Sequence, residues 1–199
     1  DMETLWAAAA RCIREAVAGA GISPAEIAGV GCTGHGKGLY LWGRDGRPAA
    51  PGVASTDHRA KAVAEHWMTD STAEKARAYT MQRVLDCQPA ALLRWFRDNR
   101  PAVYENIRWI FEAKDYIRFR LTGEAYAEYT DSSGTSLLNL HTRQFDRELL
   151  QLYGIPEMWE ALPPLRASAD ICGHVTAEAA ALTGIPAGTP VCGGMFDID

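Results

Sequence analysis

The chain has 199 residues, of which 47% are hydrophobic and 23% charged, and its formal net charge is −5. This composition is that of a globular domain with a core of useful size, and the lack of a basic block argues against a nucleic-acid partner. No apolar run is long enough to cross a bilayer. The five cysteines are scattered without a CxxC pair, which favours reduced thiols and a cytoplasmic protein over disulfides or a zinc site.

Hydrophobic periodicity predicts helices and strands that alternate along the chain. An apolar stripe over 3–20 predicts a first helix that Gly21 ends, and Asp45-Gly46 predicts a hairpin turn. Further helices are expected at 58–69, 72–79, 89–99, 113–121, 133–138, 146–152 and 176–182. Strands are expected at 27–33, 39–42, 108–112, 124–129, 173–175 and 189–192. This alternation indicates an α/β fold with a partly parallel sheet.

The most informative pattern is Gly193-Gly194-Met195-Phe196-Asp197, which follows the apolar run 189–192. It predicts a buried strand that opens into a tight turn carrying an acid, and ligands of open α/β sheets bind at such strand ends. Asp197 can serve there as a general base, a metal ligand or a helix N-cap, and the residues alone leave these alternatives open. Because a natural domain rarely stops at the mouth of its own site, we expect the chain to be part of a longer protein.

Two further segments are candidates for ligand contacts. Glycines alternate in Thr33-Gly34-His35-Gly36-Lys37-Gly38, so the backbone can approach a ligand closely, although the spacing fits neither a P-loop nor a dinucleotide fingerprint. Lys37 either contacts the ligand or lies in solvent. Asp57 either accepts hydrogen bonds from polyol hydroxyls or caps a helix that begins at 58, with Arg59 in solvent.

The residues of two later segments, taken by themselves, favour a structural role over a ligand-binding one. The basic and aromatic residues of 113–123 better fit an amphipathic helix ended by Gly123 than a nucleic-acid surface. The hydroxyl-rich segment 128–135 is typical of a turn and helix cap.

Taken in order, these segments resemble one family, the FGGY carbohydrate kinases, from residue 2 to residue 199. The matching segments are Thr33–Gly38, Ser55–Arg59, Lys114–Gly123, Thr130–Thr135 and Gly184–Asp197. Within the family, three departures from the D-xylulose kinase pattern resemble the L-xylulose (3-keto-L-gulonate) kinase branch. These are His35-Gly36-Lys37-Gly38, Ser55-Thr56-Asp57 and the Gly-Gly-Met-Phe-Asp turn. Kinases of D-xylulose, erythritol or other polyols are the alternatives within the family.

The resemblance implies two actin-like, ribonuclease-H-like domains with ATP and Mg²⁺ in the cleft between them. Residues 1–199 would be an incomplete first domain that binds the sugar, with a mixed sheet flanked by helices. The first strands with their phosphate loop and the whole C-terminal nucleotide domain would be absent. Such a chain is expected to be inactive by itself, and we expect no metal ligand among its residues.

The resemblance also implies the chemistry of the site. It places the general base for phosphorylation of a ketose hydroxyl on Asp197, with Asp199 as the competing candidate. Gly36, Lys37, Asp57 and Phe196 would contact the sugar, which is the expected small-molecule partner. A homodimer is left open. Two other functions are also left open: a non-catalytic sugar-binding module, and a hydrolase with Asp57 and Asp197 as its carboxylate pair.

Overall fold

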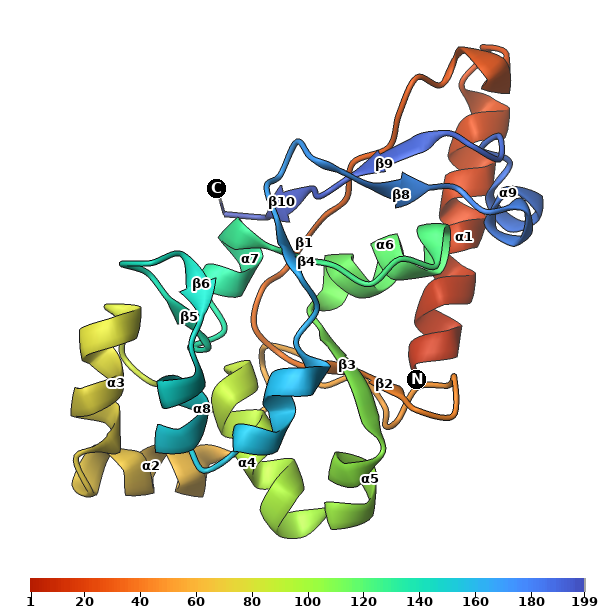
Figure 1. Ribbon diagram of the computed structural model, residues 1–199. Coiled ribbons are helices and arrows are strands. Elements are labelled where there is room, and N and C mark those ends of the chain that lie inside the picture. Colours follow the sequence, from red (N-terminus) through yellow and green to blue (C-terminus); the bar gives the residue numbers. More distant parts are fainter. Residues whose placement is uncertain (199) are drawn as a thin grey trace.

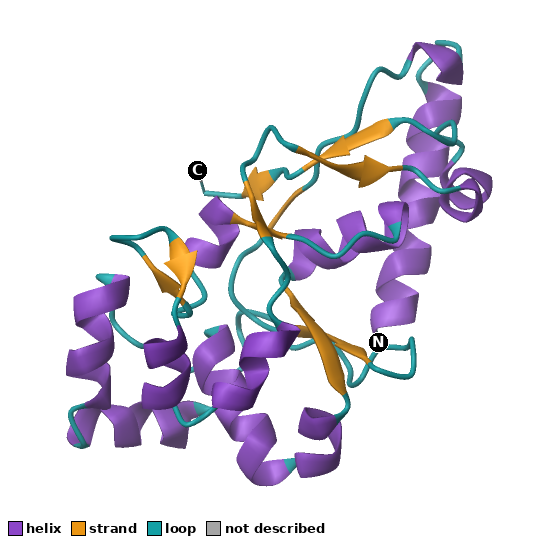
Figure 2. Ribbon diagram, viewed as in Figure 1, coloured by secondary structure: helices purple, strands orange, loops and turns teal. Residues whose placement is uncertain are grey.

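Helices and short strands alternate through residues 1–198, the part of the chain that the computed structural model describes (Figure 1, Figure 2). The helices are α1 (Met2–Gly19), α2 (Lys61–Thr69), α3 (Thr72–Thr80), α4 (Pro89–Asn99), α5 (Pro101–Glu105), α6 (Ala113–Thr122), α7 (Tyr129–Ser133), α8 (Arg147–Leu152) and α9 (Ala177–Thr183). Short 3₁₀ turns are η1 (Pro24–Glu26) and η2 (Pro156–Ala161). No helix within residues 1–198 combines the length and apolar character needed to traverse a membrane.

The strands pair two by two, in both parallel and antiparallel fashion. They are β1 (Thr33–Gly34), β2 (Tyr40–Gly43), β3 (Ile107–Phe111), β4 (Ala127–Glu128), β5 (Leu138–Asn139), β6 (Gln144–Phe145), β7 (Leu165–Arg166), β8 (Ile171–His174), β9 (Pro190–Cys192) and β10 (Met195–Phe196). Parallel pairs are β1 with β10 and β4 with β7, whereas β2 with β3, β5 with β6 and β8 with β9 are antiparallel. The parallel bridge of Val30 with Val191 extends the first pair.

The parallel pairing of β1 with β10 decides where the candidate residues lie. Thr33 is opposite Met195 and Gly34 is opposite Phe196. Since parallel strands end on the same side of a sheet, the loop after β1 and the turn after β10 emerge together. In Figure 1 the end of the described chain lies beside β10, near α7.

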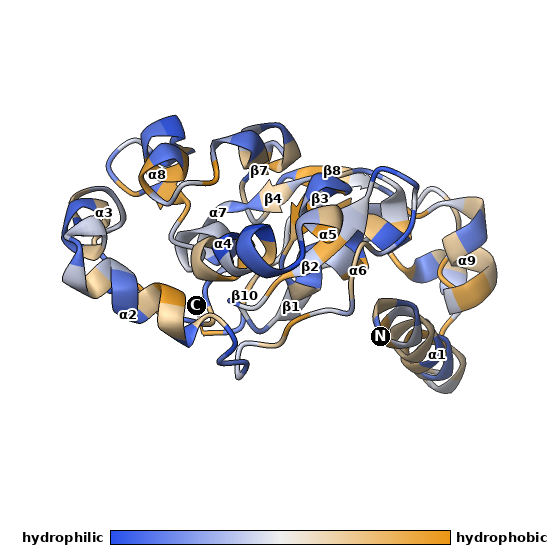
Figure 3. Ribbon diagram, turned by 90° about the horizontal axis from the view of Figure 1, so that it is seen from below, coloured by the Kyte–Doolittle hydropathy of each residue, from blue (hydrophilic) through white to orange (hydrophobic). Residues whose placement is uncertain are grey.

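Two buried clusters form the core, and β2 contributes to both. Alternate side chains of an extended chain point to opposite faces, so Leu41 and Leu39, which directly precedes β2, enter one cluster and Tyr40 the other. The first cluster joins α2, α3, α4, α8 and η2 around β3, and the second joins α1, α6, α9 and β9. In Figure 3, α2 alternates hydrophilic and hydrophobic residues along its length, as a helix with one buried face does.

Most predicted elements are present, with shifted ends. The helix expected at 89–99 is α4, and Thr176 caps α9 by accepting the Ala179 N–H. The strand expected at 27–33 is reduced to a bridge and the short β1.

The helix expected at 133–138 is wrong. Glu128 caps the chain earlier by accepting the N–H groups of Thr130 and Asp131, so α7 begins at Tyr129. Ser136 then adopts a left-handed conformation with φ of 65°, which a continuing right-handed helix does not allow. The hairpin of β5 and β6 follows instead.

Candidate functional site

The glycine loop and the terminal turn pack against each other. A Cβ atom on Gly36 would lie 2.5 Å from the Phe196 ring and 2.7 Å from Asp131 Oδ1, so only glycine fits at this position. Phe196 is 8% exposed, and its N–H donates to Thr130 Oγ1 at 2.9 Å. The Asp197 N–H donates to the Gly34 carbonyl at 3.1 Å, and the Asp197 side chain is exposed.

Lys37 is half-buried against this pair of segments. Its Nζ atom lies 5.9 Å from the centroid of the Phe196 ring, within the range of a cation–π contact. Its backbone is left-handed with φ of 63°, and its N–H donates to Glu112 Oε1 at 2.8 Å. The structure therefore brings Gly36, Lys37 and Phe196 together, with Asp197 the next residue along the chain.

Asp57 lies in a separate contact with Arg59. The Asp57 carboxylate accepts the Arg59 N–H at 2.8 Å and both Nε and Nη2 of its guanidinium, at 2.9 and 2.8 Å. These hydrogen bonds hold the pKa of Asp57 below its usual value. Arg59 also lies over the Trp95 ring, 5.1 Å from its centroid, so it is not simply solvated.

The other interpretation of Asp57, a helix cap, is wrong. α2 begins at Lys61 and has Ala60 as its N-cap, without a capping side chain. Among residues 1–198, no hydrogen bond or ion pair joins Asp57 to Gly36, Lys37, Phe196 or Asp197.

Beneath the loop and the turn lies a buried network of charges. Lys114 Nζ is 2.7 Å from Asp115, 3.3 Å from Asp131 and 3.4 Å from Glu128. Arg118 Nη1 is 2.8 Å from the Asp115 carboxylate, and both basic side chains are fully buried. The amphipathic helix expected at 113–121 ends at Gly123 as predicted. Lys114 and Arg118 face the interior, however. Lys114 pairs with Glu128 and Asp131 from the chain after the helix, and Arg118 pairs with Asp115 of the helix itself.

This network holds the terminal turn in place. Arg118 Nη1 donates to the Gly193 carbonyl at 2.6 Å, and Thr130 Oγ1 donates to Glu128 at 2.6 Å while it accepts the Phe196 N–H. Burial acts to raise the pKa of Glu128, but the hydrogen bonds from Thr130 and the charge of Lys114 outweigh it and lower that pKa. Glu128 is thus ionised and fixed.

Glu112 and Asp131 are the site residues that the sequence interpretation missed. Glu112 follows β3 directly and is 4% exposed, and Asp131 is fully buried. Burial is the largest cause that raises the pKa of Glu112 well above its usual value, and the neighbouring Asp131 raises it further. The sequence offered one signal for Glu112, which is a charged residue directly after an apolar strand. For Asp131 the only signal was its position in the hydroxyl-rich turn.

The described residues do not fit a resident magnesium ion. Within residues 1–198, no group of three or more His, Cys, Asp or Glu side chains is placed to hold a metal. The buried carboxylates of Asp131 and Glu128 already face a cation of the protein, Lys114.

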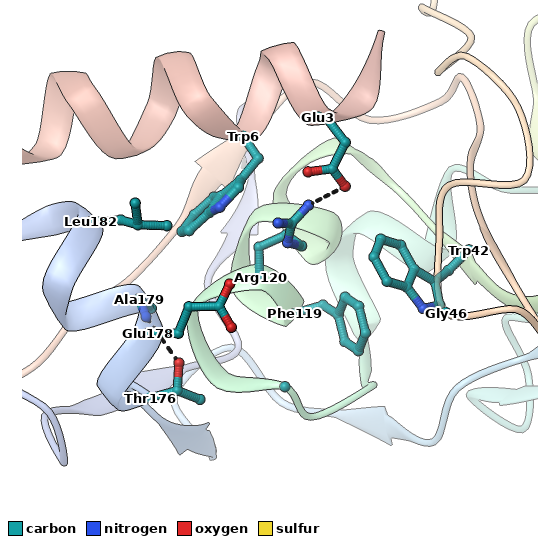
Figure 4. A pocket seen from close by; sticks show the side chains of 11 residues that line it. Glu3, Trp6, Trp42, Gly46, Phe119, Arg120, Thr176, Glu178, Ala179 and Leu182 are labelled. Carbon is teal, nitrogen blue, oxygen red and sulfur yellow. Dashed lines mark hydrogen bonds and ion pairs between the residues drawn. The ribbon is translucent and has the colours of Figure 1, made fainter.

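A pocket of about 360 Å³ lies elsewhere, between α1, α6 and α9 (Figure 4). Arg120 projects into it, and its guanidinium lies 5.3 Å from the centroid of the Trp6 ring. Arg120 Nη1 is already paired with the Glu3 carboxylate at 2.6 Å. This contact ties α1 to α6.

Comparison with known proteins identifies the family. Residues 1–199 match the N-terminal domain of the FGGY family of carbohydrate kinases. A probable L-xylulose kinase from Pasteurella multocida is 37% identical, and an L-xylulose/3-keto-L-gulonate kinase from Escherichia coli is 38% identical. Each comparison covers the whole of this chain but only 41% and 40% of the relative. The chain thus spans about two fifths of these relatives.

The solved structures agree with this assignment. The crystal structure of xylulose kinase from Rhodospirillum rubrum is 31% identical and superimposes with a TM-score of 0.90, covering all of this chain and 40% of that one. A gluconate kinase from Lactobacillus acidophilus, 24% identical over 99% of this chain and 39% of its own, has the same fold with a TM-score of 0.90. The expected actin-like, ribonuclease-H-like α/β fold is confirmed. The chain belongs to the FGGY family of carbohydrate kinases.

Proposed function

We propose that this chain supplies the sugar-binding part of a cytoplasmic kinase that phosphorylates a hydroxyl of L-xylulose, 3-keto-L-gulonate or a closely related ketose. Membership of a carbohydrate kinase family implies ATP as the phosphoryl donor. The relatives named for L-xylulose support the substrate class. The observation that carries the proposal is the joint emergence of the Lys37 loop and the Asp197 turn from the parallel strands β1 and β10.

In this proposal Asp197 is the general base. A sugar hydroxyl is a weak nucleophile, and a carboxylate in hydrogen-bond reach orients it and accepts its proton as the phosphoryl group transfers. The exposed Asp197 side chain is available to substrate, and its N–H bond to Gly34 fixes its backbone. Phe196 and Gly36 shape the wall beside it, and Lys37 and Asp57 contact the sugar. Mg²⁺ would neutralise charge on the ATP phosphates when bound.

The test of the base is Asp197→Asn in the full-length kinase. We expect turnover to fall by about 10²–10⁴-fold while the sugar still binds, because the amide keeps the shape but cannot accept a proton. Steady-state kinetics and sugar titration measure the two effects. The matched control is Asp199→Asn; Asp199, the competing base, lies outside the described residues. An inactive Asp199 variant beside an active Asp197 variant would overturn the assignment.

We also propose that ATP binds to parts of the kinase beyond residues 1–199, since this chain spans only about two fifths of its relatives. Titration calorimetry of ATP into chain 1–199 tests this, with circular dichroism to verify that the chain is folded. We expect no heat of binding and no phosphorylation of ketose. Tight ATP binding by the folded chain would contradict the proposal.

A further inference from the structure

We propose that Glu112 and Asp131 share one proton, and that Glu112, as a neutral acid, is the residue that positions the Lys37 loop for the sugar. The positioning role rests on the proposed kinase function, whereas the shared proton does not. Glu112 touches no substrate here; it acts through the backbone of Lys37.

The first observation is a set of buried oxygens without partners. Glu112 Oε2 and both carboxylate oxygens of Asp131 are buried, and none has a hydrogen-bond partner among residues 1–198. A hydrogen bond between the two side chains contributes to both pKa shifts: it raises the pKa of Glu112 and acts to lower that of Asp131. Two carboxylates cannot satisfy one another, but a carboxylic acid donates to a carboxylate. A single proton between Glu112 and Asp131 therefore gives Glu112 Oε2 and one of the Asp131 oxygens their missing partner.

The second observation is the charge balance of the network. The fully buried charged groups of the network that contains Glu112 and Asp131 are two cations and, besides Glu112, three acids. Tyr40 is another titratable side chain beside Glu112, and the half-buried Lys37 side chain lies by the Phe196 ring. The cations are Lys114 and Arg118, and the acids are Asp115, Glu128 and Asp131. Four buried carboxylates against two cations would leave two uncompensated negative charges. A buried carboxylate that lacks a compensating cation takes up a proton rather than remain charged.

The neighbours of each acid indicate which one holds the proton. Asp131 Oδ2 lies 3.3 Å from Lys114 Nζ, and a nearby cation favours the charged form. Within residues 1–198 no cation pairs with Glu112, and its Oε1 accepts the neutral N–H of Lys37. We therefore place the proton on Glu112 Oε2, which donates to Asp131, while Oε1 keeps its bond to Lys37.

The bond to Lys37 is what couples the pair to the site. Lys37 is a non-glycine residue with φ of 63°, a left-handed conformation that needs support from its surroundings. The support within the described chain is the Glu112 side chain, 75 residues away in sequence. Losing it frees the loop that presents Lys37 beside Phe196.

The experiment compares Glu112→Gln with Glu112→Met in the full-length kinase. The glutamine amide accepts from Lys37 and donates to Asp131, as the neutral acid does, whereas methionine has a similar size and neither function. We expect Glu112→Gln to keep the KM for sugar within about twofold, and Glu112→Met to raise it about tenfold with kcat changed less than about threefold. Equal KM values for the two variants would overturn the positioning role.

A second readout does not depend on activity. Infrared spectra of the same full-length preparations at neutral pH should show the carbonyl band of a buried protonated carboxyl in the wild type. Glu112→Gln should lack that band, and Thr183→Ser, a buried change far from the pair, should keep it. If the band is absent from the wild type, the shared proton is wrong. If the enzyme phosphorylates no sugar but the band behaves as expected, only the proposed function has failed.

Discussion

Lys37 is the residue whose contacts bear most directly on substrate choice. A half-buried cation beside the Phe196 ring can pair with an anionic group of a ligand, or donate hydrogen bonds to hydroxyls. L-xylulose is neutral, whereas 3-keto-L-gulonate has a carboxylate. The two substrates therefore separate the two roles of this one side chain.

Lys37→Met should weaken 3-keto-L-gulonate much more than L-xylulose. Truncating a partly buried charge pair costs about 2–4 kcal/mol, against about 1 kcal/mol for one hydrogen bond to a neutral hydroxyl. We therefore expect kcat/KM for the acid sugar to fall at least about tenfold further than that for L-xylulose. Lys37→Arg, which keeps the charge, is the control. Equal losses on the two sugars would mean that Lys37 contacts a hydroxyl that both share.

At the scale of elements, the pairing of β1 with β10 depends on the double glycine before β10. Gly194 has φ of 72°, and a Cβ atom there would lie 2.0 Å from the Cys32 carbonyl oxygen. That same oxygen accepts the Met195 N–H at 3.1 Å. Close approach of the two backbones at Gly194 is thus a condition for the register that aligns the loop with the turn.

Gly194→Ala should lower the free energy of unfolding by about 3 kcal/mol or more, because backbone strain and a clash with a main-chain oxygen add together. Gly188→Ala is the matched control. Gly188 has φ of 87° but nothing within 4 Å of the site of its Cβ, so strain alone should cost about 1 kcal/mol. Urea denaturation of both variants measures the difference. Similar losses would show that the contact with Cys32 does not constrain the turn.

At the scale of the whole molecule, the charge network connects segments that are distant in the chain. It joins the Lys37 loop through Glu112 and the terminal turn through Arg118 and Thr130. A raised pKa in such a network affects the stability of the entire fold. Glu112 is protonated in the native state because its pKa is raised there. Its contribution to the free energy of unfolding therefore decreases as the pH rises from the pKa of the unfolded chain toward that of the native state.

The pH dependence of unfolding should therefore differ between the wild type and Glu112→Gln. Glutamine does not titrate, so this loss of stability is absent in the variant. Relative to the wild type, the free energy of unfolding of the variant should increase with pH above about 4.5, by up to about 1.4 kcal/mol per pH unit. Denaturation series from pH 5 to pH 8 measure it. A constant difference across that range would mean that Glu112 is ionised throughout.

Local patterns were sufficient for much of the fold and part of the site. The helices at Pro89–Asn99 and Ala177–Thr183 follow from apolar periodicity and from capping by Thr176, which act over a few residues. The glycine loop and the Gly-Gly turn were recognisable because close backbone approach demands glycine. These features are local, so the order of residues along the chain determines them.

Tertiary structure alone decided the rest. Sequence periodicity predicted an amphipathic helix at Ala113–Thr122, yet Lys114 and Arg118 are buried, because Glu128 and Asp131 pair with Lys114 and the distant Gly193 carbonyl accepts from Arg118. Likewise, Glu112 reaches a backbone N–H 75 residues away. The burial of a charge depends on partners that only folding brings within a few ångströms. The sequence by itself therefore determined the elements and the candidate loops, and the packing decided which acids hold a proton and which segments they fix.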